Sequence, residues 1–390
     1  MSGNLSDRLK FNKESFFYFA WILMEIHICT ANSDAEKFSS PIISYISLLV
    51  FCLKIVLTKY RKREIIMIVL LLIGSIVCFR TNSDMRVVWF VLVIAASKKI
   101  DFNKIVKYSL RTMIICCFVF LMLYFLRVTE GVYIVSNRGE RLSFGLGHPN
   151  ICSAYYGLII IQYIYIHFEQ IKVRHLLLFA LGALPIYLGT KSNTGFLVTV
   201  LALIFVFIIK VLPAKQFNTK IIVIGLLGGI AFFTFAPIFY NNSLNVLDSM
   251  MTGRLHQANY YYEIYGIHIF GSDITHDLMN PNRDNILDIG IAKMLINNGI
   301  FYYTLVVGGY TICLKKAISD NRKDLLALFG TMIIYLFAEN VATYIFMNVS
   351  MLAFSQLIFC NKKQNYSVSI GEQENLQYER YNITGKSTNT

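Results

Sequence analysis

The sequence predicts an all-α, polytopic integral membrane protein with about twelve membrane-spanning helices. Of its 390 residues, 56% are apolar and only 15% are charged, whereas soluble domains carry about 25% charged residues. Apolar runs of nearly bilayer-spanning length recur along the chain, and the Lys and Arg residues fall in short clusters between them. This composition excludes a soluble enzyme, a disordered scaffold and a secreted disulfide-rich domain. The clustering of the charge, formally +13 net, indicates membrane topology and argues against a nucleic-acid partner.

Each predicted span is an apolar run bounded by polar residues, and about 17–25 residues are needed to cross a bilayer. In chain order the runs are residues 16–30, 40–57, 65–79, 86–97, 110–126, 150–168, 175–188, 194–212, 220–240, 289–314, 325–338 and 341–359. The run 86–97 is the weakest, and a partly interfacial position is its alternative. We expect residues 1–360 to form a single transmembrane domain and the polar residues 361–390 to form a cytoplasmic tail.

The basic residues predict the orientation of these spans. If the N-terminus is cytoplasmic and the sides alternate, every inner connection is basic, as at residues 59–63, while the outer connections hold fewer Lys and Arg. The positive-inside rule therefore favours a multi-pass protein with both termini in the cytoplasm. The eight Cys residues include no CxxC pair, so neither a disulfide framework nor a zinc site is indicated.

Two outer connections are long, residues 127–149 and residues 241–288, and the second separates the ninth and tenth predicted helices. Long loops in compact proteins are usually functional, so these two are expected to form the site.

The first long loop continues into the segment RGERLSFGLGHPN, residues 138–150. It offers Arg138 and Arg141, then His148 directly before a proline, then Asn150. That proline is suited to the first position of a helix, and a helix N-terminus suits an anion. Its glycines would allow a close backbone approach. The alternative is an ordinary solvated turn that leads into a helix.

The second long loop has helical character over residues 254–265. Arg254 and Tyr261 share one face of this predicted helix, and His256 lies on a neighbouring face. Its many Tyr side chains could contact a sugar or lie at the membrane interface. The loop ends at Asp288, a candidate base.

A third outer feature is the short turn GTKSNTG, residues 189–195, which carries Lys191. A snorkelling interfacial Lys is the alternative reading. The His residues have no HxxxH or HxH spacing and the loop carboxylates are scattered, so no metal is expected. No cofactor motif for a nucleotide is present either. Arg and Lys at a surface that excludes water suit a diphosphate, and a nearby His or Asp suits deprotonation of a hydroxyl. A lipid-linked diphosphate donor fits these constraints.

Three short motifs, in this order and topology, carry a family resemblance. They are RLSFGLGHPN at 141–150, TGRL at 252–255 followed by FG at 270–271, and DIGIAKMLINNGI at 288–300. With these motifs the chain resembles the Wzy-type polysaccharide polymerases, relatives of the O-antigen ligases. Such proteins often have Ser-Arg-Thr-Gly before the eighth helix, whereas this chain has SNTG at 192–195. A role carried by that Arg would pass to Lys191.

The resemblance implies a GT-C-like helical fold in the cytoplasmic membrane of a bacterium. It implies a metal-independent, inverting glycosyltransferase that uses undecaprenyl-diphosphate-linked glycans as donor and acceptor. The product would be a capsule, O-antigen or exopolysaccharide, and a flippase and a chain-length regulator would be partners.

The resemblance also suggests roles for the candidate residues. Arg254 and Arg141 would hold the diphosphate, and His148 or Asp288 would orient or deprotonate the acceptor hydroxyl. The catalytic candidates are therefore His148, Arg254 and Asp288. The substrate-binding candidates are Arg138, Arg141, Asn150, Lys191, His256 and Tyr261.

Two other functions stay open at this point. An O-antigen ligase would share the donor chemistry and differ in the acceptor. A polysaccharide-lipid transporter or flippase often has two similar halves and ionisable residues at the bilayer midplane. This chain shows no internal repeat, and its ionisable residues within spans are few, namely Glu25, His27 and Lys54.

Overall fold

The structure is a computed structural model that describes residues 13–136, 139–212, 216–275 and 287–359. Within these residues the fold is mostly helical. The α-helices are α1 (Lys13–Ala31), α2 (Pro41–Val56), α3 (Lys62–Asn82), α4 (Arg86–Ala96), α5 (Phe102–Phe125), α6 (Pro149–Ile166), α7 (Val173–Thr190), α8 (Asn193–Val211), α9 (Gln216–Phe235), α10 (Asn245–Met250), α11 (Arg254–Tyr265), α12 (Gly290–Ile296), α13 (Gly299–Ser319), α14 (Lys323–Leu336) and α15 (Ser355–Ile358). Four short 3-10 helices are η2 (Glu36–Phe38), η3 (Asn242–Leu244), η4 (Asn340–Thr343) and η5 (Val349–Phe354).

Helices α1 to α9 coincide, within a few residues at most ends, with the first nine predicted apolar runs; α5 begins eight residues early, at Phe102. By length and composition, α3, α5, α7 and α8 are each able to cross a membrane. Several shorter helices, including α2 and α4, are also apolar. The coarse prediction of a mainly helical membrane protein therefore agrees with the structure.

The prediction of one helix over residues 289–314 is wrong. Helix α12 ends at Ile296 and α13 begins at Gly299, with Asn297 and Asn298 between them. Gly299 has φ +82°, and a Cβ there would lie 2.3 Å from the backbone nitrogen of Gly271. The glycines of the FG and NNGI motifs thus allow the backbone at Gly271 to contact the backbone at Gly299. The helix is interrupted at this contact.

The prediction of one helix over residues 341–359 is also wrong. This segment consists of η4, an irregular stretch, η5 and the single turn α15. The side chain of Asn348 donates to the carbonyl oxygen of Ala342 at 2.7 Å and to the Tyr310 hydroxyl at 2.8 Å. All of residues 345–354 are buried. Irregular backbone at membrane depth is tolerated when protein covers it in this way.

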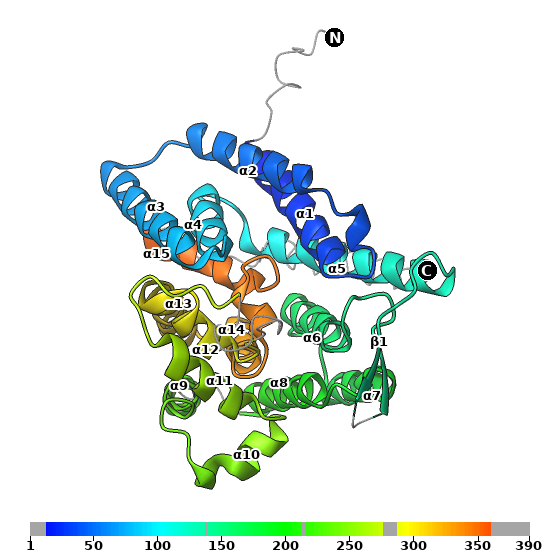
Figure 1. Cartoon of the computed structure of the whole chain (residues 1–390). Coiled ribbons are helices and arrows are strands. Elements are labelled where there is room, and N and C mark those ends of the chain that lie inside the picture. The colour runs from blue at the N-terminus through cyan, green and yellow to red at the C-terminus, as the bar shows by residue number, and fades with distance from the viewer. Residues whose placement is uncertain (1–12, 137–138, 213–215, 276–286, 360–390) are drawn as a thin grey trace, which may run out of the picture.

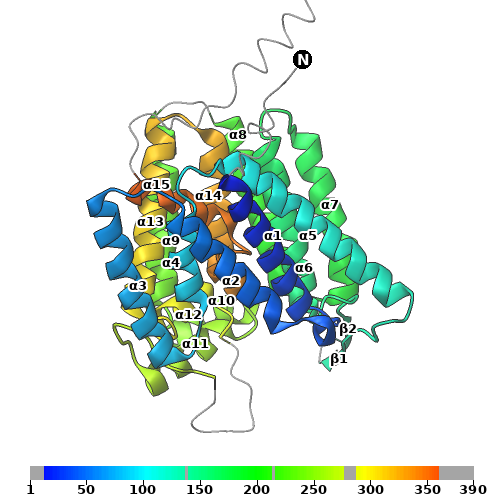
Figure 2. The same ribbon diagram turned by 90° about the horizontal axis from the view of Figure 1, so that it is seen from above.

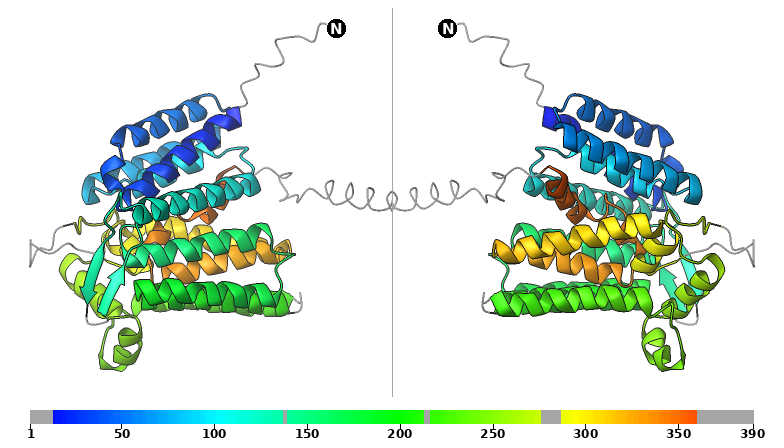
Figure 3. Two further views of the ribbon diagram at one scale, coloured as in Figure 1. Left: turned by 90° about the vertical axis from the view of Figure 1, so that its right-hand side faces the viewer. Right: turned by 90° about the vertical axis from the view of Figure 1, so that its left-hand side faces the viewer.

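The first long loop adds a small β-hairpin to the otherwise helical fold. Strands β1 (Tyr133–Ser136) and β2 (Gly139–Leu142) pair antiparallel, with Ile134 opposite Arg141. The second long loop contains η3, α10 and α11, so the predicted helix over 254–265 is confirmed. The hairpin, α10 and α11 gather at one end of the helical bundle (Figure 3).

Helix α14 is the centre of the bundle. It packs against α6, α8, α9 and α13, and all but a few of its side chains are buried. Figures 1 and 2 show it enclosed, with α1 to α5 on one side and α6 to α9 on the other. Its C-terminal end therefore carries Glu339 and η4 into the middle of the bundle end that holds both long loops.

Candidate functional site

The start of α6 organises the first cluster of predicted site residues. His148 is the N-cap residue of α6, and its Nδ1 accepts the backbone N–H of Asn150 at 3.1 Å. Pro149 occupies the first helical position, as predicted. The Asn150 Oδ1 accepts from Nη2 of Arg141 at 2.6 Å and from the Ser192 hydroxyl at 3.0 Å. Strand β2, helix α6 and the turn before α8 are thereby joined.

The glycines of the same loop allow the close backbone approach that the sequence predicts, and the partner is the protein's own backbone. Gly145 and Gly147 both have positive φ, at +85° and +73°. A Cβ on Gly147 would lie 2.3 Å from the carbonyl oxygen of Asn32, and one on Gly145 would lie 2.6 Å from that of Phe120. These glycines let the loop pack against the ends of α1 and α5 and thereby fix the position of His148.

The second cluster surrounds Arg254, the first residue of α11, which is only 3% exposed. Its Nη2 lies 3.1 Å from Oδ2 of Asp288, and its Nη1 lies 3.1 Å from Oε1 of Glu339. Nη1 also donates to the carbonyl oxygen of Ala338. Its Nε is buried without a hydrogen-bond partner in the structure. One guanidinium is thus shared by two carboxylates.

Glu339 was missed by the sequence reasoning. The available signal was a carboxylate placed directly between two apolar runs, where it is costly unless it is paired. Burial, opposed by Arg254 and assisted by the charge of Asp288, raises the pKa of Glu339 to about 7. Two carboxylates on one cation leave one of them able to hold a proton near neutral pH.

The two clusters act on each other through His148. Burial lowers the pKa of His148 below its usual value, Arg141 and Arg254 lower it further, and Asp288 opposes them. The predicted catalytic residues His148, Arg254 and Asp288 are therefore brought near one another from distant parts of the chain. Because Nδ1 of the neutral ring accepts the Asn150 N–H, its proton is assigned to Nε2.

These two pKa shifts predict opposite effects of pH on stability. His148, with its folded pKa below about 6.5, contributes stability above that pH that is lost as the pH falls through the lowered pKa. Glu339 contributes stability that is lost as the pH rises from its ordinary pKa of 4.5 to about 7. We measure how the thermal unfolding temperature in detergent changes as the pH rises, and compare each variant with the wild type. In His148→Asn this temperature should fall more, or rise less, than in the wild type. In Glu339→Gln it should rise more, or fall less, than in the wild type. Unchanged slopes between about pH 4.5 and 7 in both variants would contradict this pairing of effects.

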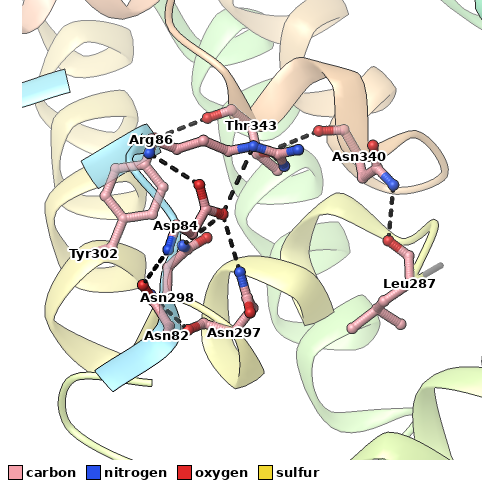
Figure 4. A network of polar contacts seen from close by, with 9 residues as sticks. All are labelled: Asn82, Asp84, Arg86, Leu287, Asn297, Asn298, Tyr302, Asn340 and Thr343. Carbon is pink, nitrogen blue, oxygen red and sulfur yellow. Dashed lines mark hydrogen bonds and ion pairs between the residues drawn. The ribbon is translucent and has the colours of Figure 1, made fainter. Parts of the chain in front are cut away.

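A third polar cluster, not predicted from the sequence, joins the α3–α4 connection to the α12–α13 break (Figure 4). Asp84 Oδ2 accepts from the side-chain amides of Asn297 at 3.0 Å and Asn298 at 3.2 Å. Its Oδ1 accepts the backbone N–H of Arg86 at 2.9 Å. The Arg86 Nη1 donates to the Thr343 hydroxyl at 3.1 Å. The two Asn residues that interrupt the predicted tenth helix are thus bound by Asp84, and Arg86 joins the same α3–α4 connection to η4.

Three predicted residues lie away from this centre. The side chain of Lys191 reaches the hairpin, since a Cβ on Gly139 would lie 2.7 Å from its Nζ. His256 is exposed on α11, and its ring lies 5.4 Å from that of Tyr240. Tyr261 is 3% exposed and stacks on Tyr265 at 5.9 Å. Arg138 lies outside the described residues.

The chemistry of the centre follows from its charges. The cations Arg86, Arg141 and Arg254 share this end of the bundle with the carboxylates of Asp84, Asp288 and Glu339. Because the pKa of Glu339 is raised to about 7, part of the cationic charge is not compensated near neutral pH. No group of His, Cys, Asp and Glu side chains among the described residues is arranged to hold a metal ion. Comparison with known protein families, curated proteins and solved structures found no match. A positive centre with a carboxylate and a neutral imidazole could bind an anion beside a hydroxyl and take up its proton.

Proposed function

We propose that this chain polymerises undecaprenyl-diphosphate-linked oligosaccharide repeat units into a surface polysaccharide at the outer face of the bacterial cytoplasmic membrane. The supporting observation is the convergence of His148, Arg254 and Asp288 at the end of the bundle that carries both long loops. The alternation of basic and less basic connections in the sequence predicts that this end faces outward, which supports the same location. A GT-C-like fold, without metal or cofactor, is part of the proposal.

In the proposed reaction the acceptor hydroxyl attacks the anomeric carbon of the donor glycan. The bond from that carbon to the diphosphate breaks, the configuration inverts, and undecaprenyl diphosphate leaves with the bonding electron pair. Asp288 takes the hydroxyl proton. Its side chain is 25% exposed, compared with 7% for Glu339, so it is the carboxylate that a substrate can reach.

Arg254 and His148 have supporting roles in this scheme. Arg254 holds Asp288 in place and, with Arg141, contributes positive charge where the diphosphate departs. His148 presents its Nε2–H as a hydrogen-bond donor, because its Nδ1 is already used to cap α6. It therefore orients the substrate, and proton uptake falls to Asp288.

Deletion of the gene, followed by gel analysis of surface glycans, tests the proposal. We expect long chains to disappear while a single repeat unit is still made and displayed. Wild-type chain should restore the ladder, Asp288→Asn should not, and Asp273→Asn, an exposed carboxylate of the same loop, should restore it. Loss of all external repeat units would support a flippase instead. Long chains that stay on the carrier lipid would support a ligase.

A further inference from the structure

Lys293 of α12 lies beside the site and is half-buried. Among the residues that the structure describes, no carboxylate comes within ion-pair distance of its Nζ. Burial lowers the pKa of Lys293 to about 7, the charge of Arg86 acts in the same direction, and Asp84 and Asp288 oppose this shift. The protonated side chain thus loses hydration without gaining a partner, and a bound anion would stabilise that charged form.

The position of Lys293 on α12 explains these neighbours. The backbone N–H of Asn297 donates to the carbonyl oxygen of Lys293 at 2.9 Å, so the two residues lie one turn apart on the same helix face. Asn297 donates from that face to Asp84. Lys293 is therefore directed toward the α3–α4 connection, where Arg86 begins α4, and it lies between this connection and Asp288.

Arg86 has donors left for a ligand. Its Nη1 donates to Thr343, its Nε lies 3.7 Å from Asp84, and its guanidinium lies 5.7 Å from the centre of the Tyr344 ring. The remaining N–H groups of its five-donor fork make no hydrogen bond in the structure, and the side chain is 27% exposed. Asp84 already accepts from two Asn amides and a backbone N–H, so its charge is shared among several donors.

Arg254 differs from Lys293 and Arg86 in that its donors are already occupied. Both of its terminal nitrogens face carboxylates or a carbonyl oxygen, so its capacity for a further anion is small. We propose that Lys293 and Arg86 together form a phosphate-binding subsite, and that it holds the diphosphate of the lipid-linked substrate. The identity of that diphosphate rests on the proposed function, whereas the subsite rests on the free cationic donors of Lys293 and Arg86.

Binding of inorganic diphosphate to the full chain in nanodiscs, measured by calorimetry, tests the subsite. We expect Lys293→Gln and Arg86→Gln each to weaken binding by about 10-fold or more, the usual effect of losing a charged hydrogen-bond partner. Lys293→Arg should keep most of the affinity. The matched controls are Lys37→Gln in η2 and Arg80→Gln in the last turn of α3, two exposed cations, and both should bind as wild type does. Thermal unfolding confirms that each variant is folded.

The second part of the experiment measures binding of undecaprenyl diphosphate, supplied in phosphatidylcholine nanodiscs. If this lipid binds more tightly than inorganic diphosphate, the lipid is the source of the anion. Wild-type affinity for inorganic diphosphate in folded Lys293→Gln, or an equal loss in the two controls, would overturn the subsite. If Lys293→Gln loses diphosphate binding but gene deletion leaves long glycans unchanged, the subsite stands and the polymerase proposal fails.

Discussion

Replacement of Arg254 by Ala is expected to abolish long glycan chains, with the rate of polymerisation falling by about 10²–10³. The change removes positive charge beside the departing diphosphate and frees Asp288 from its 3.1 Å ion pair. It also leaves Asp288 and Glu339 facing each other without a cation. Removal of one partner of a buried ion pair costs about 3–5 kcal/mol of stability, so the single variant mixes a folding effect with a catalytic one. Arg254→Lys should also be impaired, because a point charge cannot serve two carboxylates as a planar fork does.

A double variant separates the two effects. In Arg254→Gln with Glu339→Gln, one buried charge of each sign is removed, so the local repulsion is relieved and the thermal unfolding temperature should recover toward wild type. We expect polymerisation to stay lost, as judged by glycan ladders in cells that lack the native gene. Arg322→Ala, which breaks the ion pair between the N-cap residue of α14 and Asp324 in its first turn, is the matched control and should form normal chains. Long chains in the folded double variant would mean that Arg254 has only a structural role.

The sequence predicted those parts of the fold that depend on local pattern. Apolar runs bounded by charges located α1 to α9, and the His-Pro pair located the start of α6. The sequence-based prediction was wrong at residues 341–359. An apolar segment has the same composition whether it crosses a bilayer as a helix or lies as irregular backbone in a protein core. The polar Asn348, which bonds to Ala342 and Tyr310, was the local sign of that difference.

Part of the candidate site could also be predicted from local sequence. His148, Arg254 and Asp288 stand in loops where charged residues have few structural uses, so their residue types were informative. Asp84 and Asn297 form a hydrogen bond only because the α3–α4 connection packs against the α12–α13 break. No local sequence pattern predicts that tertiary contact. Helical spacing placed Tyr261 beside Arg254 but could not tell that this face of α11 packs into the core.

His148 has a structural use and a proposed chemical one, and these involve different ring nitrogens. Nδ1 accepts the Asn150 N–H and caps α6, while Nε2 carries the proton that we expect to meet the substrate. Asn at an N-cap accepts the same backbone N–H, so His148→Asn should keep α6 and the thermal unfolding temperature near neutral pH. It cannot present a donor where Nε2–H stood. We therefore expect polymerisation to fall by about 10²-fold or more, as for other donors aimed at developing negative charge.

Two comparisons make the His148 result decisive. His148→Ala loses the cap as well as the donor, so it should lower stability by about 1 kcal/mol in addition to removing activity. Asp101→Asn changes the N-cap of α5, where Asp101 accepts from the N–H groups of Asn103 and Lys104, and it should leave chain formation unchanged. Polymer made at the wild-type rate by His148→Asn would show that the ring serves only as a helix cap. The contacts that orient the acceptor would then have to come from Arg141 and Asn150, which are held next to the same helix start.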